Sequence, residues 1–185
     1  MSEAVLAPLA AWQNFYVIIG SAAATLTGLL FVVITLVSGA LGRVSSPWSG
    51  IRVFSTPNVM HFGAALLIAA FLSAPWPALW PAGLLVGLVG LGGVIYVFIV
   101  LWEVRHRLMS YQLVLSDWLW YTLLPLIAYI ALLVAGILLT IYPALALFVI
   151  AGGTLLLVIM GIRNAWDVVT YMVIESPQSQ NRSQD

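Results

Sequence analysis

Arginines alternate with apolar runs along this chain in a regular pattern. All six basic residues are arginines, and no lysine occurs. They lie between the first and second runs, between the third and fourth, and at the end of the fifth: Arg43, Arg52, Arg105, Arg107, Arg163 and Arg182. Because basic residues resist translocation, this alternation predicts five membrane spans, with the N-terminus outside and the C-terminus in the cytoplasm.

The composition agrees with a membrane protein. Hydrophobic residues make up 63% of the 185 residues and charged residues 6%, whereas about a quarter of a soluble domain is charged. A spanning helix needs about 20 apolar residues, so five of them use nearly the whole chain. We therefore expect an all-α integral membrane protein, a five-helix bundle in a cell membrane such as the bacterial inner membrane, with the lipid bilayer as its main partner.

Prolines and capping residues set the expected boundaries of the spans. Thr56-Pro57 is typical of a helix start, and Trp80-Pro81 is expected in the turn before the third span. Pro125 is expected to kink the fourth span, and Tyr142-Pro143 to form a tight hairpin. The spans are expected at about 14–40, 58–74, 82–104, 118–141 and 143–174, in one domain over 1–177, with a disordered cytoplasmic tail over 178–185.

Several classes of site have no support in the sequence. The chain has no cysteine, which excludes disulfides and thiolate metal sites. It has no zinc-protease, serine-hydrolase or phosphate-loop motif, so we expect neither catalysis nor a bound cofactor or metal. Its formal net charge is zero, so no basic surface is expected to bind nucleic acid.

Small and polar residues form a stripe along the first span. They recur at seven-residue spacing, with one more on a neighbouring face: Asn14, Ser21, Gly28, Thr35 and Thr25. Such a stripe can line a pore, or it can let two helices approach closely. Close packing is the commoner role of small residues and is the interpretation we favour. Packing is also the favoured role of the glycines in the third and fifth spans.

One ionisable residue lies well inside an expected span. His61 is about one turn into the second span, and Asn58 precedes it by three residues. Ionisable groups in membranes often mark a pathway or a ligand site, but a neutral histidine near the interface can also bond to headgroups or backbone. A haem between His61 and His106 is disfavoured, because His106 lies between two arginines and haem ligands need buried imidazoles.

Charged residues gather at the expected cytoplasmic ends of the spans. They comprise Glu103, Arg105, Asp117, Arg163 and Asp167. The arginines serve topology and headgroup binding, but carboxylates contribute little to orientation. We therefore expect Glu103 or Asp117 to pair with Arg163 and join the inner ends of the helices.

These features leave three hypotheses for function. The leading one is a homo-oligomeric channel or transport component with the first span nearest its axis, because five helices with so few polar residues are unlikely to enclose a conduit alone. The second is a non-catalytic accessory or scaffold subunit that binds other membrane proteins. The third and weakest is a lipid-modifying enzyme at the headgroup layer that uses His61 and the charged residues.

Overall fold

The computed structural model describes residues 9–40, 48–107 and 119–181, with side chains described for 9–36, 57–102, 119–167 and 169–170. This part of the chain is helical apart from short turns, and it contains no strand. Its elements are α2 (Gln13–Ala40), α3 (Trp48–Ser73), α4 (Leu79–Arg107), the π-helical turn η1 (Leu119–Leu123), α6 (Leu124–Leu138) and α7 (Pro143–Asn181). The prediction of an all-helical fold is confirmed.

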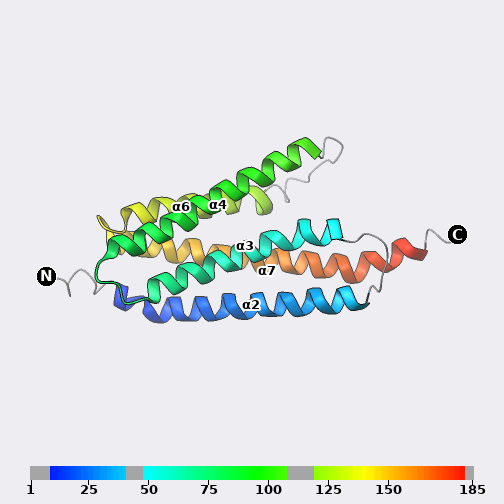
Figure 1. Ribbon diagram of the computed structural model, residues 1–185, viewed down its shortest axis with the longest axis horizontal. Helices are drawn as coiled ribbons and strands as arrows, with labels where there is room; N and C mark the ends of the chain where they lie inside the picture. Colours follow the sequence, from blue (N-terminus) through cyan, green and yellow to red (C-terminus); the bar gives the residue numbers. More distant parts are fainter. Residues whose placement is uncertain (1–8, 41–47, 108–118, 182–185) are drawn as a thin grey trace.

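The helices form an elongated bundle in which consecutive helices run in opposite directions (Figure 1). One end, here called the turn end, holds the connections over 74–78 and 139–142. The opposite end holds the last residues of α2, α4 and α7 and the start of α3. It is here called the arginine end, because Arg52, Arg105 and Arg107 occupy helical positions there.

Four of these helices are long and apolar enough to cross a membrane: Gln13–Leu36, Leu79–Trp102, Leu119–Leu138 and Pro143–Asp167. The apolar part of α3 whose side chains are described, Pro57–Ser73, is shorter. The protein is therefore a multi-pass membrane protein by the length and composition of its helices, since about 20 apolar residues cross the hydrocarbon layer.

The start of α3 differs from the prediction. Instead of beginning at Thr56-Pro57, the helix begins at Trp48 and contains Pro57 in its interior. A proline removes one backbone hydrogen bond. Continuing the helix still pairs more backbone groups than an irregular segment would, which matters most near lipid because few partners are available there.

Two further boundaries show the influence of proline. α4 begins at Leu79, so Trp80-Pro81, expected in the preceding turn, lies in its first turn, where a proline's missing N–H has no helical partner to lose. Pro125 lies in the first turn of α6, directly after η1. The expected irregularity of the fourth span is thus a single π-helical turn, the form in which the rare π-helix is mostly found.

The turn before α7 agrees with the prediction, whereas the end of α7 does not. The N–H of Tyr142 donates to the carbonyl of Leu138 at 2.8 Å, and α7 begins at Pro143. It continues through Pro177 to Asn181, so residues 178–181 are helical although a disordered tail is predicted. Pro177 removes one backbone hydrogen bond, and only about one turn of helix follows it. Residues 182–185 lie outside the described part.

Glycines bring α4 and α6 into backbone contact. A Cβ atom at Gly83 would lie 2.5 Å from the carbonyl oxygen of Gly136, and one at Gly90 would lie 2.5 Å from the backbone nitrogen of Leu133. The ring of Tyr129 occupies the space beside Gly93. The packing role predicted for the glycines of this helix is confirmed at these positions, since small residues are what allow such close approach.

Candidate functional site

The half of the bundle nearer the arginine end contains a cluster of buried polar side chains. Asn58 and His61 come from α3, Tyr129 from α6 and Asn164 from α7, and each is at most 2% exposed. Elsewhere the core is mostly apolar. Polar groups buried in a membrane protein are costly and are therefore candidates for function.

His61 and Tyr129 join α3 to α6 across the interior. The Nδ1 atom of His61 lies 3.0 Å from the phenol oxygen of Tyr129, and their ring centroids are 5.8 Å apart. Either group can donate, depending on the histidine tautomer. The position of Tyr129 is set from its other side by Gly93 of α4. A side chain larger than hydrogen at residue 93 would collide with the phenol ring, so the glycine is what admits it.

Asn58 and Asn164 lie at the same level of the bundle. α3 and α7 run antiparallel (Figure 1) and pack together. The ring of Phe62 fits against Gly161, with its Cε1 atom 2.5 Å from where a Cβ would be. Asn58 is four residues before Phe62, and Asn164 is three residues after Gly161. Each is therefore about one helical turn from this contact, displaced toward the arginine end.

The carboxamides of these two asparagines have no partner among the described residues. Neither the Oδ1 nor the Nδ2 atom of Asn58 or Asn164 forms a hydrogen bond with that part of the chain. A buried polar group left unpaired costs about 1–3 kcal/mol. Chemically, the cluster offers several uncharged donors and acceptors. The described residues contain no group of three or more histidine or acidic side chains that could hold a metal ion.

The stripe of α2 points away from the rest of the chain. Asn14, Ser21, Thr25, Gly28 and Thr35 are all exposed, and a Cβ atom at Gly28 would have nothing within 4 Å. The threonine hydroxyls bond to carbonyls of their own helix, Thr25 to Ser21 at 2.8 Å and Thr35 to Phe31 at 2.9 Å. The stripe therefore does not face the interior of the described part of the bundle, whereas a Cβ atom at nearby Gly20 would lie 3.0 Å from the Cβ of Ala69 in α3.

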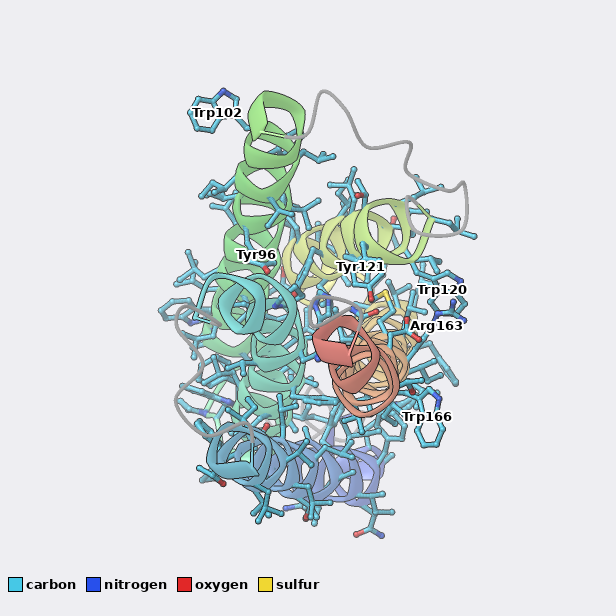
Figure 2. All side chains as sticks on the ribbon, turned by 90° about the vertical axis from the view of Figure 1, so that its right-hand side faces the viewer. Tyr96, Trp102, Trp120, Tyr121, Arg163 and Trp166 are labelled. Carbon is cyan, nitrogen blue, oxygen red and sulfur yellow. The ribbon has the colours of Figure 1, made fainter. Side chains whose placement is uncertain are left out.

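Arg163 and Asp167, the two members of the expected charged layer whose side chains are described, each contact an aromatic residue of η1. The guanidinium carbon of Arg163 lies 4.3 Å from the centroid of the Trp120 ring. The hydroxyl of Tyr121 donates to Asp167 at 3.4 Å. Figure 2 shows Arg163 and Trp120 together on the outside of the bundle, with Tyr121 directed toward α7. The side chains of Glu103, Arg105, His106 and Asp117 lie outside the described residues.

Sequence patterns alone do not identify the contact of Tyr129 or the burial of Asn164. Tyr129 is in the middle of an apolar span, far from the interface where tyrosines are usually found in membrane proteins, and this position is the signal that identifies it. Asn164 directly follows Arg163 and lies three residues before Asp167, a setting typical of a solvated face, whereas its side chain is fully buried.

Comparison of the chain with protein families, with curated proteins and with solved structures found no match.

Proposed function

We propose that the chain crosses a cell membrane five times, with its N-terminus outside and its C-terminus in the cytoplasm. The alternating direction of the helices and the arginine positions at one end of the bundle support this topology (Figure 1). The shortest apolar segment, Pro57–Ser73, is roughly 26 Å long at 1.5 Å per residue. With the preceding helical turns of α3 it is long enough for a bilayer of about 30 Å.

Within that topology, we infer that the protein acts as a homo-oligomeric channel or transport component, with α2 at the contact between copies. The observation that carries this proposal is the orientation of α2. Its buried residues Tyr16, Ala23 and Leu30 repeat every seven positions. They are offset by two positions, about 200° around the helix, from the stripe of Asn14, Ser21, Gly28 and Thr35.

The most polar face of α2 thus points away from its own bundle. A face in contact with lipid gains nothing from asparagine, serine and threonine, whereas small and polar residues are favourable between helices or beside water. The interior of a single chain leaves less room for a transport path, because toward the turn end it is filled by large buried side chains such as Tyr16, Leu139 and Leu147. A transport path is therefore better placed between copies than within one.

A non-catalytic accessory or scaffold subunit is the second candidate. The length of α7, 39 residues, favours it, because a helix of roughly 58 Å extends well beyond a bilayer and offers a surface to another protein. The lipid-modifying enzyme has less support, since His61 is buried and bonded to Tyr129 rather than facing the headgroup layer.

Native mass spectrometry in mild detergent tests these candidates. We expect a closed homo-oligomer for the wild type and a shift of roughly tenfold or more toward smaller species for Gly28→Leu, because overpacking a close contact costs about 1–3 kcal/mol. Gly92→Leu is the matched control: Gly92 is also an exposed helical glycine with nothing within 4 Å of a Cβ. A monomer that co-purifies with other membrane proteins would favour the scaffold.

Flux measurements in proteoliposomes separate transport from scaffolding. We expect Ser21→Ala to change ion flux while leaving the oligomer intact, since an interhelical hydroxyl bond in a membrane is worth only about 0.6 kcal/mol. If the wild type conducts nothing and Gly28→Leu assembles normally, the placement of α2 at an axis is wrong.

A further inference from the structure

We propose that Asn58, Asn164 and His61 form a binding site for a small uncharged solute that both donates and accepts hydrogen bonds, as an amide does. The site lies inside one chain and does not depend on the α2 contact between copies. Tyr129 positions His61 through the 3.0 Å bond between its hydroxyl and Nδ1.

The need for a ligand comes from the two carboxamides. Asn58 and Asn164 are both fully buried, with 0% exposure, and their oxygen and nitrogen atoms have no hydrogen-bond partner in the described part of the chain. Each carboxamide can donate twice and accept twice. Nearly all buried polar groups in folded proteins are paired, and an apolar side chain would be the more stable choice at two positions that bind nothing.

The register of α3 and α7 brings the two asparagines to one level of the bundle. The contact between Phe62 and Gly161 fixes the register of α3 and α7, and it sets the two asparagines at one level on facing helices. Ala65 and Val158 belong to the same packed cluster as Phe62, which supports this register over a further turn. His61 is three residues from Asn58, on the same face of α3 about one turn deeper.

The surroundings favour an uncharged solute. None of the described residues in the cluster carries a full charge at neutral pH when the histidine is neutral. The nearest charged side chains on α7, Arg163 and Asp167, are exposed and engage Trp120 and Tyr121 at the surface (Figure 2). A charged ligand would lose its hydration without gaining a counter-charge, which is strongly unfavourable.

Three isosteric probes of different charge test the site: acetamide, acetate and acetamidinium. Thermal unfolding of the purified full-length protein in detergent is measured at rising millimolar concentrations of each. Acetamide is expected to raise the Tm saturably by about 2–4 °C near saturation. The shift is expected to vanish in Asn58→Leu and in Asn164→Leu, and to persist in Thr140→Leu, a polar-to-leucine substitution at an exposed position of the turn end.

A second measurement keeps the proposal decisive if the leucine variants fail to fold. In wild-type protein labelled with ¹⁵N-asparagine, acetamide is expected to shift the side-chain NH₂ signals of two asparagines and to leave that of Asn14 in place. A larger Tm shift with acetate or acetamidinium would overturn the uncharged class. Unchanged NH₂ signals together with an unchanged Tm would overturn the site itself, whatever the oligomeric state proves to be.

Discussion

The hydroxyl of Tyr129 and the Nδ1 atom of His61, 3.0 Å apart, connect two helices that are not neighbours in sequence. The two residues are 68 positions apart, and both are buried. Because Tyr129 also fills the space beside Gly93, this pair holds α3, α4 and α6 in one arrangement. Hydrogen bonding and close packing thus act on the same side chain.

Tyr129→Phe is expected to destabilise the protein through this bond alone. The ring and its contact with Gly93 remain, while Nδ1 of His61 loses its partner. The expected loss is about 0.6–1.7 kcal/mol, the range of such bonds in membranes, measured by unfolding in mixed detergent and SDS micelles. Tyr142→Phe, at an exposed tyrosine of the turn end, serves as the control. An equal effect of the two substitutions would mean that the bond contributes nothing.

Gly90 and Gly92 provide a matched pair of positions on α4. At Gly90 a Cβ atom would lie 2.5 Å from the nitrogen of Leu133 and 2.9 Å from the carbonyl oxygen of Tyr129, whereas at Gly92 nothing lies within 4 Å. Gly90→Ala is expected to force the two backbones apart at a cost of about 1–3 kcal/mol. Gly92→Ala is expected to be neutral or slightly stabilising, because alanine favours helix over glycine. Unfolding measurements on both variants check the difference.

The sequence predicted those features that depend on short-range signals. Hydropathy located the helices, Tyr142-Pro143 located the last turn, and the glycines of α4 indicated close packing. It did not predict that α3 continues through Pro57, because local capping signals compete with the need to pair backbone groups near lipid. Nor did it identify the partner of His61. The spans are apolar on most faces, so hydropathy does not specify which side of each helix faces inward.

The stripe of α2 shows the same limitation in another way. Its periodicity is visible in the sequence and favoured a close-packing face, but the sequence did not indicate which helix it packs against. The structure places Tyr16 on the opposite face, with its hydroxyl donating to the carbonyl of Leu147 at 3.3 Å. That contact fixes the rotation of α2 and leaves Gly28 outside the bundle. The rotation of α2 about its own axis decides whether the stripe packs inside the bundle or faces outward.

The proposed topology predicts the location of fused reporters. Fusions after Arg43, after Arg107 and at Asp185 are expected to be cytoplasmic, and fusions near Pro77 and Pro143 to be external, because basic residues are retained in the cytoplasm. Alkaline phosphatase and green fluorescent protein report the two sides. An external C-terminus would show that the chain has an even number of spans or the reverse orientation.

Arg163 and Trp120 are expected to stabilise the contact between η1 and α7. The guanidinium lies over the indole at 4.3 Å from its centroid, and such a pair is worth about 0.5–1 kcal/mol at an exposed site. A double-mutant cycle with Arg163→Gln and Trp120→Leu measures this coupling. The same cycle with Trp80→Leu, a tryptophan at the turn end that is 63% exposed, is the control and is expected to give no coupling. Coupling indistinguishable between the two cycles would contradict the contact.

Gly161 offers the most direct test of the register between α3 and α7, on which the placement of Asn58 and Asn164 depends. A Cβ atom at Gly161 would lie 2.5 Å from Cε1 of Phe62, and that ring is buried and has little room to move. Gly161→Ala is therefore expected to destabilise the protein by about 1–3 kcal/mol. Gly152→Ala, at a glycine of the same helix with nothing within 4 Å, is expected to have no such effect.

Replacing Phe62 by leucine shortens the side chain that meets the new methyl group. Phe62→Leu combined with Gly161→Ala should therefore cost less than the sum of the two single substitutions. Unfolding free energies of the four variants test the contact between Phe62 and Gly161. Additive costs for Phe62→Leu and Gly161→Ala would mean that these residues do not meet. The two asparagines would then not share one level of the bundle.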